Sequence, residues 1–294
     1  MQRTQRMHVV INQDINMIEA KVIEDSVSIY GDRITTMQIK FQRFILPEFL
    51  THRVFSRNFS SSRAIPTAKL IEQVRNDPAM PVHWGKNQAG MQARVELSDD
   101  ERLEAIGRWK YAASVAAANA QCLSDLGAHK QIVNRVLEPY MWVTGIVTST
   151  EWENWNSLRD HEDAQPEIRE LAKTMKVAYD ASEPVELVIG DWHLPYVTPA
   201  EKRNSLLSLT SLIRVSAARC CRVSYLKHDG ATPSIEDDMK LFERLAGAEP
   251  KHYSPLEHQA TPDGFLGQSY VRPELHGNFR GWIQFRKLDE HGYV

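Results

Sequence analysis

The chain has 294 residues, 42% of them hydrophobic and 25% charged, and a formal net charge of -3. This composition is typical of a globular protein with a substantial core, and the nearly neutral charge disfavours a protein that coats nucleic acid. The sequence has neither an apolar run of about 18 residues nor the pattern of a signal peptide, so we expect a cytoplasmic protein without a membrane partner.

A β-hairpin is predicted over residues 21–42, where two partly alternating runs flank a Gly-Asp turn. Pro47 then predicts a short helix, because proline is favoured in the first helical turn. We expect this helix to place Phe49 and Leu50 inward. The hairpin and helix together lead into a polar stretch at residues 51–63.

Residues 51–63 hold three arginines, one histidine and four serines around two phenylalanines. Arginine offers a rigid fork of donors to phosphate, and serine hydroxyls with successive backbone N–H groups form concave anion sites. One phosphate would not need so many donors, so we expect two phosphorylated ligands to meet here. The alternative is an arginine-rich surface loop.

A capping box at Ser98–Glu101 predicts the start of an alanine-rich helix that continues to about residue 126. Its expected buried stripe contains Leu103, Ile106 and Ala113. Before this helix, residues 77–90 are rich in proline, glycine and asparagine and predict a long loop. Such a loop either covers a functional site or is a plain surface excursion.

Two more helices are predicted, one over residues 129–137 that stops at Pro139 and one that starts at Pro166. The inner face of the second contains Ile168, Leu171, Ala172 and Met175. Between these helices, Trp152 and Trp155 are expected in the core rather than on a ligand platform.

The last third of the chain begins with a proline-rich stretch, residues 183–203, which predicts an internal linker. A leucine-rich helix is expected from about Ser205, and Ser234 predicts the N-cap of another helix. The three cysteines are Cys122, Cys220 and Cys221. An adjacent pair does not easily bridge to itself, so we expect reduced thiols.

Residues 51–63, the signature segment, resemble the signature of the flavin-dependent thymidylate synthases. The positions kept in register are His52, Arg53, Ser56, Asn58, Ser61 and Arg63. The segment departs from the family pattern at Thr51, where the family has arginine, and at Phe59, where it usually has glutamate. Residues 134–139 and 154–168 resemble later segments of the same family in their normal order.

Two further segments match this family in a different order. Residues 216–225 resemble its Ser-Ala-x-Arg-x-x-Arg-Val-Ser-aromatic segment, and residues 252–258 resemble its His-x-Ser/Thr-Pro-Phe-Glu-His segment. In the family both precede the signature, whereas here both follow it. The resemblance therefore implies a circular permutation, which domains tolerate when their natural termini lie close together.

The implied fold is a single α+β domain over residues 1–294, with a mixed sheet and flanking helices. Within it, residues 21–180 form the signature and nucleotide-binding part, and residues 205–260 form the permuted segment. Residues 267–294 form a C-terminal extension without a counterpart in the family.

The resemblance also implies an activity. These enzymes transfer a methylene group from 5,10-methylenetetrahydrofolate to C5 of dUMP and reduce it with a hydride from FADH2, which NADPH regenerates, to give dTMP. They are homotetramers with shared active sites. No cysteine here lies in the Pro-Cys-His setting of the conventional synthase, so the chemistry belongs to the cofactor and the protein supplies positioning.

The resemblance assigns roles residue by residue and implies no metal. Arg159 is the catalytic residue, which polarises the pyrimidine carbonyl edge. The nucleotide is assigned to Glu48, Ser61, Ser62, Arg63, Arg135 and Arg159, with Arg135 coming from a neighbouring subunit. FAD is assigned to His52, Arg53, Asn154, Ser224, His252, Ser254 and Glu257. Cys220 and Cys221 fall where the family has small apolar residues and are expected to pack.

Two alternatives remain open at the level of sequence. Glu48, Thr51 and Ser62 differ from the family around the nucleotide, which suits an FAD and folate enzyme that methylates or hydroxymethylates dCMP. The other alternative is a non-catalytic nucleotide- or nucleic-acid-binding relative. Its particular support is the basic tail with Arg280, Arg286 and Lys287.

Overall fold

The computed structural model describes residues 18–223, 233–246 and 248–294. In this part of the chain the main sheet has five strands in the order β3-β4-β2-β1-β5. They are β1 (Glu19–Ser28), β2 (Arg33–Gln42), β3 (Ser56–Phe59), β4 (Trp142–Ser149) and β5 (Val185–Leu187). β5 pairs parallel with β1 and the other pairs are antiparallel, so the sheet is mixed as expected.

Two short ribbons accompany this sheet. β6 (Ala260–Pro262) pairs with β9 (Trp282–Gln284), and β7 (Phe265–Leu266) pairs with β8 (Ser269–Tyr270). Both ribbons use strands of the C-terminal extension. The extension is therefore an ordered part of the fold.

The predicted hairpin is confirmed by β1 and β2. The Ser28 amide donates to the Asp32 carbonyl at 2.8 Å, and Gly31 has φ +90° in the turn. A left-handed backbone at this position favours glycine over residues with a Cβ. The turn therefore fixes the register that delivers β2 to the signature segment.

The helices are α1 (Leu46–Phe49), α2 (Thr67–Asn76), α3 (Asp99–Asp125), α4 (Lys130–Val133), α5 (Glu153–Arg159), α6 (Pro166–Asp180), α7 (Pro199–Lys202), α8 (Leu209–Arg222), α9 (Ile235–Ala246) and α10 (Phe285–Glu290). Short 3-10 helices are η1 (Arg43–Ile45), η2 (Asn134–Tyr140), η3 (Ser254–Glu257) and η4 (Pro273–Leu275). None of these described helices combines the length and the apolar character that crossing a bilayer requires.

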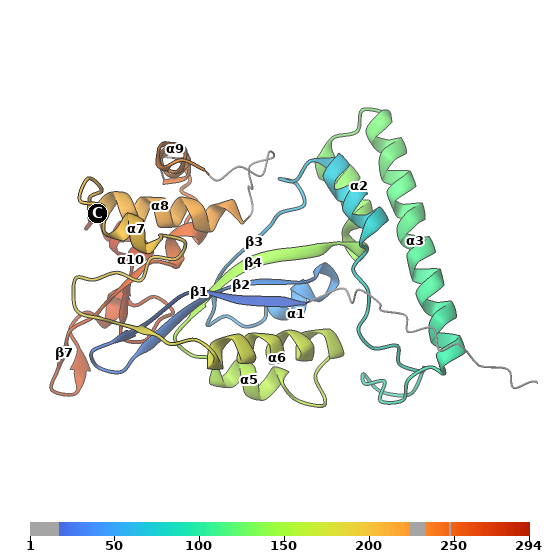
Figure 1. The fold of residues 1–294 in the computed structure, drawn as a ribbon, viewed down its shortest axis with the longest axis horizontal. Helices are drawn as coiled ribbons and strands as arrows, with labels where there is room; N and C mark the ends of the chain where they lie inside the picture. The colour runs from blue at the N-terminus through green and yellow to red at the C-terminus, as the bar shows by residue number, and fades with distance from the viewer. Residues whose placement is uncertain (1–17, 224–232, 247) are drawn as a thin grey trace, which may run out of the picture.

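The helices α5 and α6 cover one face of the sheet, below it in Figure 1. The predicted inner face of α6 is confirmed, since its four residues are at most 1% exposed. Trp152 and Trp155 are buried beside them, which confirms their core position. Side chains of β2 such as Met37 and Phe41 complete this cluster.

The opposite face of the sheet is polar where it meets the last third of the chain. His193 is buried between Ser26 and Thr36, with its ring nitrogens 2.9 and 2.8 Å from their hydroxyl oxygens. His258 lies 2.9 Å from the Thr148 hydroxyl, and burial lowers its pKa to about 3. Both imidazoles are therefore neutral structural groups that tie the later segments to the sheet.

A separate lobe is built from α2, α3 and η2, at the right of Figure 1. The predicted capping box is confirmed, because the Glu101 carboxylate accepts from the Ser98 amide at 2.8 Å. The predicted stripe is partly wrong, since Leu103 is 55% exposed. The helix buries alanines instead: Ala113, Ala116, Ala117 and Ala120. The reason is tertiary, because α2 lies beside only one half of the long helix (Figure 1).

Three further expectations need correction. The 129–137 helix is a turn of α4 that continues as η2, and Pro139 lies inside the 3-10 segment rather than ending it. Leu50 is 39% exposed because α1 is only one turn long and Phe49 alone points inward. The leucine-rich helix α8 begins at Leu209 after an N-cap at Ser208, later than expected.

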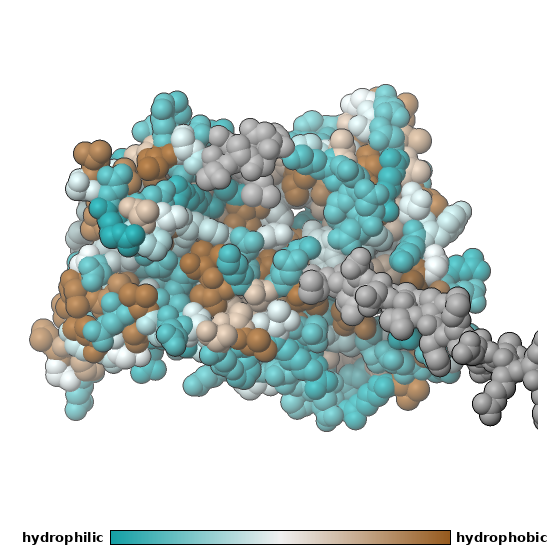
Figure 2. All heavy atoms as spheres, viewed as in Figure 1, coloured by the Kyte–Doolittle hydropathy of each residue, from teal (hydrophilic) through white to brown (hydrophobic). Residues whose placement is uncertain are grey.

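Exposed apolar side chains gather at one edge of the molecule. They are brown at the lower left of Figure 2, near β7 in Figure 1. The residues at this edge are Ile29, Tyr30, Phe265 and Leu266. The signature segment lies elsewhere, along the edge strand β3 on the other side of the sheet.

Candidate functional site

The signature segment surrounds β3, which is an edge strand paired with β4. A four-residue strand spans roughly 13 Å at about 3.3 Å per residue. Donors before β3, such as Arg53, and donors after it, such as Arg63, therefore lie at opposite ends of the strand. This arrangement provides two separate places for anionic groups.

Arg159 lies against the first half of the signature segment. Its Nε donates to His52 Nε2 at 2.8 Å, and its Nη2 donates to Thr51 Oγ1 at 3.2 Å. Burial, followed by the charges of Arg159 and Arg57, lowers the pKa of His52 to about 4. His52 is therefore neutral near pH 7, and its Nε2 accepts a hydrogen bond from the Arg159 Nε–H. This hydrogen bond holds the guanidinium in one orientation.

The helix α5 explains why these side chains meet. Trp155 and Arg159 are four residues apart and so lie on the same side of the helix. The Trp155 ring contacts the His52 ring edge-on, with centroids 4.7 Å apart, and Phe55 stacks at 5.9 Å. The buried tryptophan thus positions α5 while the arginine at its last turn reaches the signature segment.

Glu138 gathers donors at the other end of β3. Its carboxylate accepts from Ser62 Oγ at 2.7 Å and pairs with Arg43 and Arg135 at 3.1 and 2.9 Å. Arg63, which follows Ser62 in the chain, is exposed. We had not selected Glu138 from the sequence, although it belongs to the 134–139 segment that carried the resemblance. The buried Asn134 fixes the same loop by donating to the Ser62 carbonyl at 2.7 Å.

An open pocket of about 470 Å³ lies at the N-terminal end of β3. Its walls come from the signature segment (Arg53, Phe55 and Arg57), from η3 (Glu257) and from the C-terminal extension (Gly277, Asn278, Gln284, Arg286 and Lys287). We call it the signature pocket. The five residues of the extension were not predicted to line it, because nothing in their local sequence indicates which distant segment they contact.

Charge is crowded in the signature pocket. Burial and the neighbouring Arg53 lower the pKa of Arg57, while Glu257 opposes this shift. Arg57 donates to the His52 carbonyl at 2.9 Å and to the Phe55 carbonyl at 3.2 Å. Burial raises the pKa of Glu257, and Arg286 opposes that shift. An anionic ligand would relieve the excess of positive charge.

The remaining expected site residues are not brought into the pocket. Asn154, His252, Ser254 and Glu48 are exposed and do not line it. Ser224 lies outside the described residues. Within the part of the chain that is described, no group of three or more His, Cys, Asp or Glu side chains is arranged to hold a metal ion.

The helix α8 lies against the signature segment from the other face of the sheet. Asn58 Nδ2 donates to the Cys220 carbonyl at 2.9 Å, and the Cys220 side chain packs with Ile146 and Val223. Cys220 and Cys221 are both buried, which confirms their packing role, and burial raises the pKa of the Cys221 thiol to about 11.

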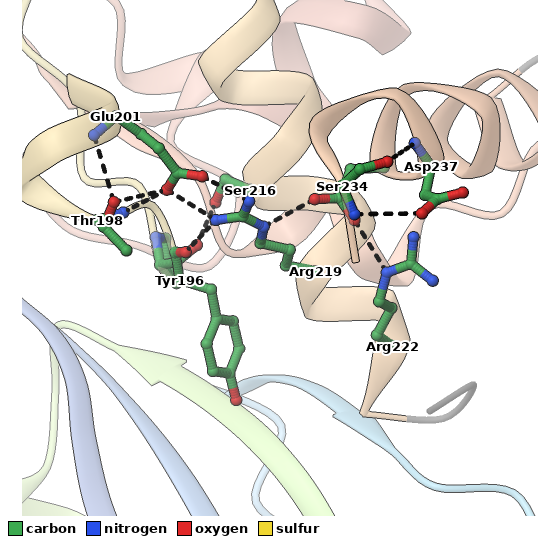
Figure 3. Close-up of polar contacts among 10 residues, drawn as sticks. Tyr196, Thr198, Glu201, Ser216, Arg219, Arg222, Ser234 and Asp237 are labelled. Atoms are coloured by element: carbon green, nitrogen blue, oxygen red, sulfur yellow. Dashed lines mark hydrogen bonds and ion pairs between the residues drawn. The ribbon is translucent and has the colours of Figure 1, made fainter. Parts of the chain in front are cut away.

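A charge network fixes α8 to its neighbours. Arg219 pairs with Glu201 at 2.7 Å and with Asp238 at 2.8 Å, and it donates to the Tyr196 carbonyl at 2.8 Å. Arg222 pairs with the second oxygen of Asp238 at 2.9 Å. Figure 3 shows Arg219 between the capping box of α7, with Thr198 and Glu201, and the start of α9. The Arg219 guanidinium lowers the pKa of Glu201 to about 2. This set is the Arg219 network.

The pattern of one protein family, described as "Thymidylate synthase complementing protein", matches residues 27–185. No curated protein sequence matches the chain. Among solved structures, the UMP/dUMP methylase PolB from Streptomyces cacaoi bound with 5-Br UMP is similar at 16% identity and a TM-score of 0.46, over 55% of this chain and 88% of that one.

Thymidylate Synthase X from Helicobacter pylori, solved with FAD and dUMP, is similar at 18% identity and a TM-score of 0.33, over 50% of this chain and 67% of that one. The family match covers more than half of the sequence and includes the whole signature segment. The chain therefore belongs to the family of the flavin-dependent thymidylate synthases and is an enzyme of their methyltransferase type.

Proposed function

We propose that this enzyme methylates C5 of dUMP to give dTMP, with 5,10-methylenetetrahydrofolate as the one-carbon donor. In this proposal FAD is the redox cofactor and NADPH its reductant; the bound flavin supplies the hydride that completes the methyl group. The observation that carries the proposal is the Arg159–His52 pair, a fixed guanidinium held at the signature segment of a chain that belongs to this family.

Arg159 is proposed to polarise the carbonyl edge of the pyrimidine. Negative charge builds up in the ring as C5 becomes nucleophilic, and a preoriented cation stabilises that charge. Neutral His52 accepts one N–H of the guanidinium at 2.8 Å, which orients the arginine without cancelling its charge. A carboxylate in place of His52 would neutralise Arg159 and weaken this effect.

The far end of β3 is proposed to bind the 5′-phosphate of the nucleotide. Arg63 has no carboxylate partner among the described residues, whereas Arg43 and Arg135 share Glu138. Arg63 is therefore available to a phosphate, with Ser61 close by in the chain, while the Ser62 hydroxyl donates to Glu138 at 2.7 Å. Arg135 is 55% exposed, which suits a second arginine that reaches a phosphate on a neighbouring subunit.

The signature pocket is proposed to hold part of the FAD. Arg53 and Arg57 supply positive charge for its phosphates, and Phe55 supplies an apolar surface. Glu257, which the resemblance assigns to FAD, lines the same pocket. The residues present therefore suit an anionic dinucleotide with an aromatic ring system.

A circular permutation is proposed to explain the order of the segments. The family match ends at residue 185, before the two displaced segments. Both displaced segments nevertheless lie beside β3: Asn58 contacts Cys220 of α8, and Glu257 of η3 lines the signature pocket. The packing of both displaced segments beside β3 supports this order.

A homotetramer with shared active sites is proposed as the working form. The helix α3 presents large apolar side chains to solvent, with Leu103 55%, Tyr111 71% and Leu126 82% exposed. Such side chains are candidates for burial between subunits. Light scattering of the purified protein should give the mass of four chains, and the mass of one chain would contradict the proposal.

A dCMP enzyme is the second candidate. The Glu48 carbonyl accepts from Thr51 Oγ1 at 2.7 Å, and the same hydroxyl accepts from Arg159. Glu48 is therefore a neighbour of the proposed base-binding arginine. Its carboxylate can accept a hydrogen bond from the exocyclic amine of cytosine, which uracil lacks.

The test is anaerobic reduction of the FAD-loaded enzyme with NADPH, followed by reoxidation with methylenetetrahydrofolate and either dUMP or dCMP. We expect flavin bands in the purified protein and dTMP from dUMP. Turnover of dCMP but not of dUMP would show that the second candidate, a dCMP enzyme, is correct. Protein that binds no flavin even with added FAD would contradict both.

A further inference from the structure

The C-terminal extension, residues 267–294, lies outside the residues that match the family and contacts the signature segment. Asn278 Nδ2 donates to the Val54 carbonyl at 2.8 Å, and Ser56 Oγ donates to Asn278 Oδ1 at 3.0 Å. The Arg280 amide donates to Thr150 Oγ1 at 2.9 Å, just after β4. The extension thus contacts both strands that carry the site.

Gln284 stabilises the contact between the extension and the signature segment. Its Nε2 donates to Ser56 Oγ and to the Glu257 carbonyl, both at 3.1 Å. Gly277 has φ +64°, and a Cβ there would meet Gln284 Oε1 at 2.5 Å. A side chain at Gly277 would therefore displace the glutamine, so the wall of the signature pocket depends on this close approach.

Two cations of the extension, Arg286 and Lys287, line the pocket together with the signature arginines. Arg286 pairs with Glu257, lies with its guanidinium carbon 5.0 Å from the centroid of the Tyr253 ring, and pairs with Glu290 at 2.7 Å. Lys287 pairs with the other oxygen of Glu290 at 2.6 Å. Both side chains are held toward the pocket by α10.

The cations around the pocket outnumber the carboxylates. Four cationic side chains line it, namely Arg53, Arg57, Arg286 and Lys287. Glu257 lines it with them, and Glu290 pairs with the two from the extension. Arg53 has no ion pair within the described residues, and Arg57 donates to backbone carbonyls. Like charges brought this close favour an anion between them.

We propose that the C-terminal extension completes a phosphate subsite, in which Arg286 and Lys287 join Arg53 and Arg57 to bind the diphosphate of a dinucleotide. The ligand class follows from the lining, since an open pocket with four cationic side chains from two distant segments of the chain suits a group with two linked phosphates. This inference rests on the proposed function, in which the dinucleotide in this pocket is FAD. NADPH carries the same diphosphate, and the test below separates the two.

The test removes charge from the extension without altering the signature segment. The variants are Lys287→Gln and Arg286→Gln, with Arg280→Gln as the matched control, because Arg280 lies on the same extension but does not line the pocket. Lys287→Gln is the milder change, since its partner Glu290 keeps Arg286. If Arg286→Gln does not fold, because it leaves Glu257 unpaired, then Lys287→Gln alone tests the proposal.

Four affinities are measured. FAD binding is followed by fluorescence quenching, and NADPH binding by the dependence of anaerobic flavin reduction on its concentration. Inorganic pyrophosphate and dUMP are titrated by calorimetry. We expect Lys287→Gln to weaken pyrophosphate and one dinucleotide by roughly tenfold, while dUMP binding and the Arg280→Gln control stay unchanged. The dinucleotide that loses affinity identifies the source of the diphosphate.

The proposal would be overturned if pyrophosphate and both dinucleotides bound to the two pocket variants with wild-type affinity. If wild-type protein binds no FAD, the proposed function fails, and pyrophosphate alone then decides the subsite. Weaker pyrophosphate binding to Lys287→Gln supports the subsite in that case, and equal binding overturns it.

Discussion

The Arg219 network and the signature pocket use the same residue type in opposite ways. In the network, Arg219 and Arg222 meet Glu201 and Asp238 at distances of 2.7 to 2.9 Å. Asp238 is fully buried, and the arginine side chains are 15% and 13% exposed. Every charge there has a counter-charge from the chain itself, which leaves no place for a ligand.

In the signature pocket the positive charges exceed the negative ones. Arg53 is exposed and has no carboxylate partner within the described residues, and Arg57 is held by backbone carbonyls. The comparison teaches that charge balance, rather than arginine content, separates a structural cluster from a binding one. Substitutions should therefore separate stability from affinity in these two regions.

The largest effect is expected at Arg219. Arg219→Ala leaves Glu201 without its arginine partner and the buried Asp238 with Arg222 alone, so the free energy of unfolding should fall by about 3 kcal/mol. Urea unfolding followed by circular dichroism measures this change. Arg108→Ala, which removes an exposed pair with Glu104, is the control and should cost about 0.5 kcal/mol or less. Equal losses would mean that the network does not stabilise the fold.

Arg159→Ala should lower turnover by roughly a hundredfold, the scale of removing one electrostatic stabiliser of a transition state. Flavin binding should persist, because Arg159 does not line the signature pocket. Steady-state dTMP formation and flavin absorbance measure the two quantities. Wild-type turnover in this variant would remove Arg159 from the catalytic role.

Arg63→Ala should weaken dUMP binding by roughly tenfold, because a charge-assisted hydrogen bond to phosphate is lost. Deoxyuridine, which lacks the phosphate, should bind wild type and variant equally. Calorimetric titrations with the two ligands provide the comparison. A loss of the same size for both would show that Arg63 does not contact the phosphate.

The last prediction concerns His52, whose pKa is lowered to about 4 from its ordinary value of 6.5. The unfolded chain binds a proton at this residue below pH 6.5, while the folded chain does not until about pH 4. The stability contributed by neutral His52 is therefore fully present above pH 6.5 and is lost as the pH falls through this window.

An NMR titration of histidine-labelled protein measures the His52 pKa directly. Arg159→Ala should raise it, since the charge of Arg159 disfavours the imidazolium. The buried His258 serves as the internal control, because its pKa is lowered by burial and does not involve Arg159. An unchanged His52 pKa in the variant would contradict the contact.

Elements whose start or turn depends on residues close together in the sequence were predictable. The Gly31 turn, the capping box at Ser98 and the proline start of α6 depend on residues that are neighbours in the chain. Leu103 and Pro139 were misassigned, because their positions depend on which elements pack beside them. Local periodicity carries no information about where α2 ends beside α3.

The site followed the same division. His52, Arg53 and Arg159 were predicted as site residues from the family pattern, and the structure brings His52 and Arg159 into contact. The wall formed by the extension was not predictable, since Asn278 meets Ser56 across 222 residues of sequence. Nor was Glu138, whose three partners come from different elements.

The most direct test of the charge-balance account is an FAD titration of two arginine variants, paired with their urea unfolding curves. Arg53→Gln should weaken FAD by roughly tenfold and leave the urea midpoint unchanged, because Arg53 is exposed and unpaired within the described residues. Arg219→Gln should lower the urea midpoint and, while folded, bind FAD as wild type does. An Arg53→Gln protein with wild-type FAD affinity, or a folded Arg219→Gln protein that loses FAD, would contradict the account.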